Sequence, residues 1–306
     1  MKLFDLHCDT PLELFLKKEK LYKNSLHISL EKAEEFEKYI QCAAIWSDPR
    51  LTEDQCFQRF FEAAEFFKGE LSRCGVTLIK TKRDLNDSTR RGAILAVEGA
   101  RLLRREPDGI ASLYNEGVRI LTLVWKGSDW AGGAWDTNEP LSPQGAECVE
   151  MCFDTGIIPD VSHGSPELIS RVLDIAEKRG ASPLATHSNS FSVNPHRRNL
   201  SDELFRRICH MGGLCGINLC PDHLCGGNAS RDDILRHIEH YINLGGEENI
   251  ALGCDFDGIS EVPDGIEDIS RLPRLYDAVA KRFGAKGADR LFFENAYKYM
   301  LNNLPD

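Results

Sequence analysis

Short apolar runs alternate with longer amphipathic stretches along most of the chain. The apolar runs are continuous, which is typical of parallel strands that are buried on both faces. They predict strands at 3–7, 39–46, 76–80, 93–98, 118–124, 156–162, 183–187, 214–219 and 249–255. Between them, apolar residues recur at helical spacing and predict helices at 53–73, 166–179, 232–243 and 285–303.

This alternation of strands and helices predicts a parallel sheet. A chain of 306 residues with 42% hydrophobic content is long enough for one large core. We therefore expect the α/β class and a (β/α)8 TIM-type barrel, built as a single domain over residues 1–306. Nine strand candidates compete for eight barrel positions. We expect the run 76–80 to lie outside the ring, because it leaves too little chain for a crossover helix before the next strand.

Two segments rich in glycine and proline interrupt the pattern, at 126–143 and 220–231. We predict that both are loops. The first follows a strand end, so it should cover the mouth of the barrel.

Composition and charge exclude some classes of binding partner. The net charge of -11, without a basic stripe, argues against nucleic acid, since phosphate binding needs a basic face. No apolar run approaches the roughly 20 residues that span a bilayer, so we expect no membrane partner. The chain enters a strand at once without a long apolar region, so we also expect no secretory signal. The 11 cysteines are scattered without a Cys-x-x-Cys pair, which favours a reduced, cytoplasmic protein.

Polar groups end five of the predicted strands. They are His7 with Asp9, Glu98, His163, His187 and Asp255. Because a (β/α)8 barrel gathers the carboxyl ends of its strands into a ring, these side chains should face one pocket. Three imidazoles and three carboxylates in one pocket suit a hydrolytic site with two metal ions.

Each of these residues also has a structural explanation. Glu98 could pair with Arg101 in the following loop, because a buried carboxylate is almost never left without a partner. His163 and His187 could each be a hydrogen-bonded core histidine. Their occurrence at successive strand ends favours metal ligands, with the second ring nitrogen held by a neighbouring acceptor.

Asp255 could pair with a loop cation, or it could face a metal-bound water and accept its proton. We favour the second interpretation. Asp257 lies one alternation further along, and we interpret it as a turn residue before Gly258. Cys8 lies between two candidate ligands, but alternation along the strand points it away from them.

The remaining histidines receive no catalytic role. His27, His210 and His223 end no predicted strand. His237 and His240 are expected on the solvated face of a helix, and His196 could only make a peripheral contact. No Gly-x-Ser-x-Gly elbow and no phosphate-binding loop motif occurs, so serine-hydrolase and nucleotide-binding functions lack their motifs.

With these residues considered, the chain resembles the membrane dipeptidase (renal dipeptidase) family of zinc peptidases, in its soluble bacterial-type form. The resemblance runs nearly end to end. It is carried by Asp5-Leu6-His7-Cys8-Asp9, Val97-Glu98-Gly99, Leu121-Thr122-Leu123, Asp160-Val161-Ser162-His163, Thr186-His187-Ser188, Arg197-Arg198-Asn199 and Gly253-Cys254-Asp255-Phe256-Asp257-Gly258. It implies a TIM-type barrel of the metal-dependent hydrolase type.

The resemblance also implies a site for two Zn²⁺ ions or other divalent metals. Its ligands would be His7 and Asp9 for one ion, His163 and His187 for the other, and Glu98 as the bridge. Asp255 matches the family's acid at the last strand. Arg198 matches the family's substrate-binding arginine, although it could instead pair with Asp202 in the helix that follows.

Two positions depart from the family pattern. Trp125 stands where mammalian members carry a substrate-binding histidine, so we place Trp125 among the substrate-binding residues. Cys220 or a near neighbour stands where a tyrosine is expected. Both changes bear on substrate preference and on polarisation of the carbonyl.

We therefore expect a binuclear zinc dipeptidase that cleaves small unblocked dipeptides with a metal-bridging hydroxide. Glu98 and Asp255 are the expected catalytic residues, and Asp255 would pass a proton from the water to the leaving amine. Arg198, Trp125 and Asp255 would contact the dipeptide. Another amidohydrolase-type barrel acting on a lactone, cyclic amide or N-acyl amino acid is one alternative, and a metal-binding protein with little turnover is the other. The sequence is also compatible with a homodimer.

Overall fold

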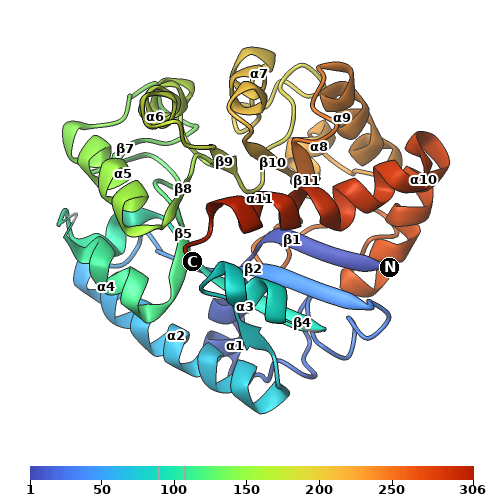
Figure 1. The fold of residues 1–306 in the computed structure, drawn as a ribbon, viewed down its shortest axis with the longest axis horizontal. Coiled ribbons are helices and arrows are strands. Elements are labelled where there is room, and N and C mark those ends of the chain that lie inside the picture. The colour runs from blue at the N-terminus through green and yellow to red at the C-terminus, as the bar shows by residue number, and fades with distance from the viewer. Residues whose placement is uncertain (89, 107) are drawn as a thin grey trace.

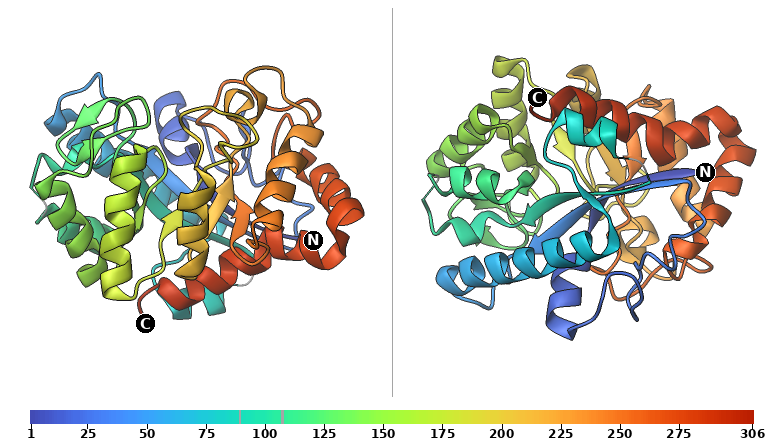
Figure 2. Two further views of the ribbon diagram at one scale, coloured as in Figure 1. Left: turned by 90° about the horizontal axis from the view of Figure 1, so that it is seen from above. Right: turned by 60° about the horizontal axis from the view of Figure 1, so that its bottom comes forward.

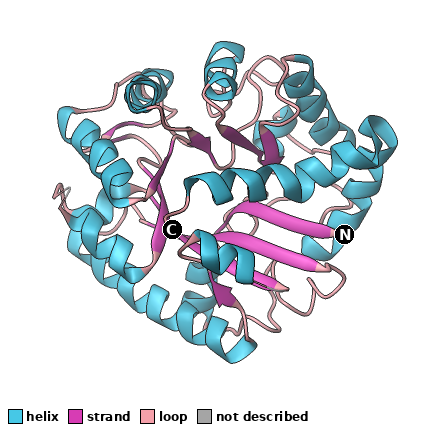
Figure 3. Ribbon diagram, viewed as in Figure 1, coloured by secondary structure: helices cyan, strands magenta, loops and turns pink. Residues whose placement is uncertain are grey.

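A computed structural model describes residues 1–88, 90–106 and 108–306. Within these residues, eight parallel strands close into a ring (Figures 1 and 3). In order around the ring they are β1 (Lys2–Cys8), β2 (Lys38–Trp46), β4 (Arg91–Glu98), β5 (Val118–Thr122), β8 (Ile158–Asp160), β9 (Leu184–Ala185), β10 (Leu214–Ile217) and β11 (Ile250–Leu252). β11 pairs with β1 and closes the ring. The predicted (β/α)8 TIM-type barrel is therefore confirmed.

Helices surround the strands, as the two further views in Figure 2 show. They are α1 (Thr10–Lys17), α2 (Glu53–Cys74), α3 (Lys82–Asp87), α4 (Gly109–Glu116), α5 (Pro143–Thr155), α6 (Pro166–Arg179), α7 (Asp202–His210), α8 (Pro221–Cys225), α9 (Arg231–Asn243), α10 (Leu272–Asp289) and α11 (Asn295–Asn303). A π-helical segment, Arg290–Glu294, joins the last two. The helix predicted over 285–303 begins just after Gly284, whose backbone is not helical and breaks α10.

The helix α6 illustrates why the sequence determines these boundaries. Ser165 caps its first turn by accepting a hydrogen bond from the Leu168 amide, and Pro166 follows at the first helical position, where no backbone donor is needed. Gly180 ends the helix with a φ of 63°, in the left-handed region that favours glycine. Between them, Val172 and its apolar neighbours bury one face against the barrel.

The strand β3 (Thr77–Leu78) confirms that the run 76–80 is the extra candidate. It pairs with β4 opposite Gly92 and Ala93. β5 pairs with β4 only from Leu95 onward. β3 therefore extends the start of β4 outside the ring instead of taking a place within it.

Both predicted loops contain regular structure. The segment 126–143 holds a small antiparallel pair, β6 (Ser128–Asp129) and β7 (Gly132–Gly133). The segment 220–231 holds α8, so the prediction of a loop there was wrong over those residues. α8 has only five residues, and a helix this short is too brief to show an apolar periodicity in the sequence.

The barrel interior is filled at one end and polar at the other. Residues two apart on the strands, such as Ile94 and Ala96 of β4, form an inner apolar cluster that includes Tyr299 and Met300 of α11. α11 therefore covers the amino-terminal end of the strands and crosses in front of them in Figure 1. Glu98 continues the series of Ile94 and Ala96, so it lies at the opposite, carboxyl end. Within the described residues, no helix is both long and apolar enough to cross a membrane.

Candidate active site

The six residues predicted at strand ends meet at the carboxyl end of the barrel. Glu98 is at the centre of the group. Its Oε1 lies 2.9 Å from Nε2 of His163, 3.4 Å from Nε2 of His187 and 3.5 Å from Nε2 of His7. One carboxylate oxygen thus lies close to three imidazoles, which stand in or just after three different strands. Arg101, the alternative partner for Glu98, instead donates to the Leu51 carbonyl, so that alternative was wrong.

His7 lies in β1 and Glu98 ends β4, whereas the other four residues stand slightly beyond their strands. β8 ends at Asp160 and β11 at Leu252, three residues before His163 and Asp255 respectively. Both residues have a positive φ, 69° for His163 and 61° for Asp255, which non-glycine residues adopt rarely. The chain therefore turns sharply after each strand and directs the side chain back over the end of the barrel.

An acid side of the site consists of His7, Asp9 and Asp255. Nε2 of His7 lies 3.4 Å from Oδ2 of Asp9 and 3.9 Å from Oδ1 of Asp255. Oδ1 of Asp9 and Nε2 of His7 are buried and have no hydrogen-bond partner among the described residues. Buried polar atoms are rarely left unpaired, so these two atoms fit a bound cation.

Gly258 makes room for these carboxylates. A Cβ atom at this position would come within 2.2 Å of Oδ2 of Asp9 and 2.6 Å of Oδ1 of Asp255. Asp257 forms the preceding turn, with a φ of 69°, and its carboxylate accepts from the Thr10 hydroxyl and the His27 amide. These contacts agree with the prediction that Asp257 is a turn residue.

A histidine side consists of His163 and His187. Nδ1 of His163 lies 3.0 Å from the carbonyl oxygen of Trp125 and donates to it. The Thr186 hydroxyl donates to Asp160 at 2.6 Å, so it accepts from Nδ1 of His187 at 2.7 Å. Both rings therefore keep an unprotonated Nε2, and these two nitrogens are only 2.9 Å apart.

This arrangement fits a metal ion. Two lone pairs directed at one point, with the Glu98 carboxylate beside them, repel one another unless a cation lies between them. Neutral imidazole nitrogen and carboxylate oxygen are common ligands of divalent zinc. The ligand atoms of His7, Glu98 and His187, and those of His7, Asp9 and Asp255, each lie within 4.8 Å of one another.

The pKa values of the two sides are shifted in opposite directions. On the acid side, burial, together with the nearby Glu98 carboxylate, raises the pKa of Asp255 to about 7 and that of Asp9 to about 6. Burial opposes a charge on His7, but Glu98 and Asp9 outweigh it and raise the His7 pKa to about 10. On the histidine side, burial and nearby positive charge hold the pKa values of His163 and His187 well below the usual value.

Arg198 reaches the site from the segment between β9 and α7. Its side chain is buried, and one terminal nitrogen donates weakly to the Ser188 hydroxyl at 3.4 Å. The remaining nitrogens, Nε and Nη2, have no partner among the described residues. Asp202, the alternative partner, accepts instead from Ser192 and His240, so that alternative was wrong.

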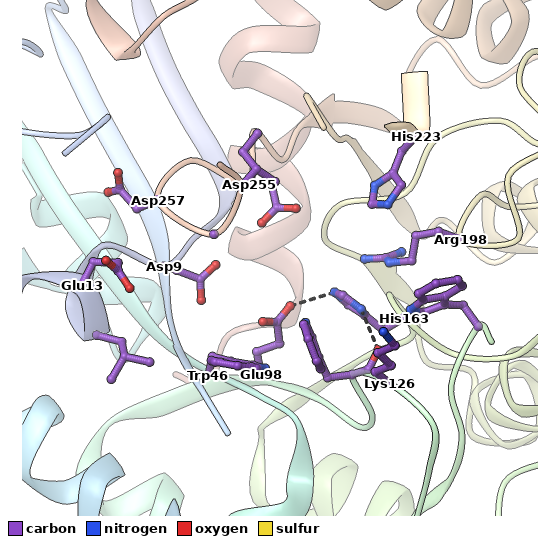
Figure 4. A pocket seen from close by; sticks show the side chains of 15 residues that line it. Asp9, Glu13, Trp46, Glu98, Lys126, His163, Arg198, His223, Asp255 and Asp257 are labelled. Carbon is purple, nitrogen blue, oxygen red and sulfur yellow. Dashed lines mark hydrogen bonds and ion pairs between the residues drawn. The ribbon is translucent and has the colours of Figure 1, made fainter. Parts of the chain in front are cut away.

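A cavity of about 320 Å³ opens over these residues (Figure 4). Its lining combines the candidate residues with three tryptophans and several charged groups. The described residues that form it are Asp9, Leu12, Glu13, Trp46, Glu98, Trp125, Lys126, Trp135, His163, Arg198, His223, Asp255, Asp257, Gly258 and Ile259. His7 and His187 lie beneath it, almost fully buried.

Sequence reasoning missed several lining residues. Trp46 ends β2 directly opposite Glu98, so the strand-end pattern could have found it. Trp135 lies in the segment predicted to cover the mouth, but no motif distinguishes it. His223 was given no role, although it lines the cavity from α8. His237 was wrongly expected on a solvated face; it is buried, where its ring bonds to the Ser190 amide and the Leu224 carbonyl.

Comparisons with known proteins agree with this fold. A model of the membrane dipeptidase family (peptidase family M19) matches residues 1–301. An uncharacterised dipeptidase of Schizosaccharomyces pombe is 34% identical over 197 residues, which cover 62% of this chain and 47% of that relative. The chain spans about half the length of the first curated relatives it matches.

Two solved structures share the fold. The dipeptidase AC, described as a metallopeptidase, superposes with a TM-score of 0.90 at 24% identity, covering 100% of this chain and 99% of that chain. A metallopeptidase of Rhodobacter sphaeroides, liganded with a phosphinate mimic of the dipeptide L-Ala-D-Ala, has a TM-score of 0.87 at 24% identity and covers 99% of both chains. Since the family model extends over nearly the whole sequence, the chain belongs to the membrane dipeptidase family, peptidase family M19.

Proposed function

We propose that this protein is a binuclear zinc dipeptidase that hydrolyses small unblocked dipeptides. The observation that carries the proposal is the position of Glu98, with one oxygen within 3.5 Å of Nε2 atoms on three histidines. His7 and Asp9 would hold one ion, His163 and His187 the other, and Glu98 would bridge them. Two bound divalent ions would supply the polarisation of the scissile carbonyl and the activation of water, so that no protein nucleophile is needed.

Asp255 is the proposed proton carrier. Its Oδ2 accepts a hydrogen bond from Asn218 at 2.9 Å, which orients the carboxylate and leaves Oδ1 facing His7 and the cavity. Oδ1 can take a proton from the attacking water and deliver it to the leaving amine. Positioned general acids and bases of this kind contribute roughly 10²–10⁴-fold to the rate.

Arg198 is the proposed anchor for the terminal carboxylate of the dipeptide. Its guanidinium offers a planar fork that matches the two oxygens of a carboxylate. Two of its nitrogens are buried without a partner among the described residues, so a carboxylate would satisfy donors that are otherwise unpaired. Trp125 lines the same cavity and would limit the size of the substrate beside it.

The proposed setting is a reducing one such as the cytoplasm, with residues 1–306 acting as one domain. The cysteines are free thiols, and most of them are buried in apolar surroundings. Homodimer formation is compatible with the proposed chemistry, since every proposed ligand comes from one chain.

The test combines metal analysis with a substrate panel. Purified protein supplied with zinc should contain about two ions per chain, the stoichiometry of a two-metal site. It should hydrolyse free dipeptides, and chelated protein should not. Hydrolysis of lactones, cyclic amides or N-acyl amino acids in place of dipeptides would identify another amidohydrolase-type activity. Metal binding without turnover on any of these would leave a metal-binding protein, and a metal content near zero after reconstitution would refute the two-ion site.

A further inference from the structure

We propose that His223 is a second anchor for the terminal carboxylate of the substrate, acting together with Arg198. The inference rests on the proposed dipeptidase function and adds a specificity-determining residue to it. His223 lies in α8, at the wall of the cavity where Figure 4 shows it beside Arg198 and across from Asp9 and Glu13.

Unpaired buried atoms carry the argument. Nδ1 of His223 is buried and has no hydrogen-bond partner among the described residues, and the same holds for Nε and Nη2 of Arg198. The Arg198 side chain is about 5% exposed. Buried polar groups are rarely left unpaired because each such group loses its hydrogen bonds to water, so three of them around one part of a cavity indicate a missing polar ligand. A carboxylate fits, because its two oxygens offer about four acceptor positions.

The segments that carry the two side chains are also tied together. The carbonyl oxygen of His223 accepts from Asn199 at 2.8 Å and from Asn194 at 3.1 Å, both in the segment that carries Arg198. The His223 ring lies 4.8 Å from the ring of His196. Nδ1 of His196 in turn accepts from the Arg198 amide at 3.2 Å. The backbone of each anchor is therefore tied to the other before any substrate arrives.

The charge state of His223 suits this role. Burial and the nearby Arg198 guanidinium lower the pKa of His223 to about 2. The imidazole is therefore neutral before substrate binds, and it can donate one N–H hydrogen bond without carrying a charge. A carboxylate accepts from the Nδ1 hydrogen and from the guanidinium at the same time. An amidated terminus offers only one acceptor oxygen together with two N–H groups, so it cannot satisfy both anchors.

The test compares two nearly isosteric variants, His223→Leu and His223→Asn. Asparagine can place an N–H group close to the position of Nδ1, whereas leucine cannot. With a free dipeptide, His223→Leu should raise KM roughly 10-fold or more, the usual effect of losing a hydrogen bond to a charged group, and should change kcat by less than about twofold. His223→Asn should keep most of the wild-type KM. With the dipeptide amide, neither variant should differ from wild type by more than about twofold.

Controls separate this role from a structural one. His210→Leu makes the same change at an exposed histidine away from the cavity and should alter none of these constants. Metal content should stay at the wild-type level in every variant. If His223→Leu does not fold, His223→Phe keeps a ring beside His196 without its nitrogens and takes its place.

The outcomes distinguish the two proposals. An unchanged KM for the free dipeptide, or an equal rise for the dipeptide and its amide, would overturn the role of His223 while leaving the dipeptidase function intact. A wild-type protein that cleaves no dipeptide would overturn the proposed function, and the role of His223 would fail with it.

Discussion

The acid side and the histidine side of the site reach a metal-ready arrangement by opposite means. On the acid side, buried carboxylates crowd around His7, two ligand atoms have no partner among the described residues, and the pKa values of Asp9 and Asp255 are raised. On the histidine side, each Nδ1 atom is hydrogen-bonded and each Nε2 is left bare. The acid side attracts a cation through the negative charge of its carboxylates. The histidine side attracts it through the lone pairs of neutral imidazoles, which hydrogen bonds hold in the right orientation.

The difference bears on how each side should respond to mutation. Charge attraction acts over several ångströms and tolerates small shifts, so the acid side should depend on how many carboxylates remain. A lone pair must point at the metal, so the histidine side should depend on the hydrogen bonds that orient its rings. Arg198 strengthens the contrast, because its positive charge adds to burial in lowering the pKa values of His163 and His187.

Glu98→Ala should have the largest effect, because Glu98 touches both sides. We expect the metal content to fall from about two ions per chain to less than one, and turnover to fall by more than roughly 10³-fold, since metal ions supply several kcal/mol of stabilisation to such reactions. Metal analysis and dipeptide hydrolysis measure both. If one ion stays fully bound, Glu98 serves only one side and is not a bridge.

Asp255→Asn should come next and should separate proton transfer from metal binding on the acid side. The amide keeps the shape of the side chain but cannot carry the proton, so turnover should fall roughly 10²–10⁴-fold while both ions remain. Single-turnover kinetics with parallel metal analysis check this. Loss of an ion would make Asp255 a ligand, and a near wild-type rate would remove it from the mechanism.

Much of the fold could be predicted from the sequence because its signals are local. Continuous apolar runs mark strands buried on both faces, and the bounds of α6 follow from its cap, its proline and its terminal glycine. The register shift in β1 between Asp5 and Cys8 could not be predicted. It depends on pairing with β2, which lies 30 residues or more along the chain, and no local preference records it.

The candidate residues could be predicted from their places at strand ends, but their geometry could not. The positive φ of His163 and Asp255 is uncommon for residues other than glycine, although Asp and His tolerate it better than most, so local sequence preference does not predict it. His223 was missed for a different reason. It lies in a short helix between glycines and prolines, where neither a strand end nor a periodic pattern draws attention to it.

Arg198→Lys should have a smaller effect, confined to substrate binding beside the histidine side. Lysine keeps the charge but loses the planar fork, so KM for a free dipeptide should rise roughly 10- to 100-fold with little loss of metal. The matched substrate is the C-terminal amide of the same dipeptide. Wild-type protein should cleave this amide poorly, and the variant should cleave it no worse than wild type does. Equal wild-type rates on a dipeptide and its amide would show that Arg198 does not read the carboxylate.

Thr186→Val should have the smallest effect and tests the orienting hydrogen bond directly. The change keeps the size of the side chain but removes the hydroxyl that links His187 to Asp160. We expect roughly 10-fold weaker binding of one ion, the lower end of the range for such supporting contacts, and no change for the other. Competition titrations with a metal chelator measure the two affinities separately.

Thr186→Ser is the matched control, because it restores the hydroxyl and should restore the affinity. The ion proposed at His7 and Asp9 provides the internal reference, since the Thr186 hydroxyl is bonded to His187 and Asp160 and to neither of these two ligands. Equal weakening of both ions in Thr186→Val would mean that the two sides are not independent. The site would then respond as one charged cluster, and the distinction between attraction by charge and attraction by oriented lone pairs would not hold.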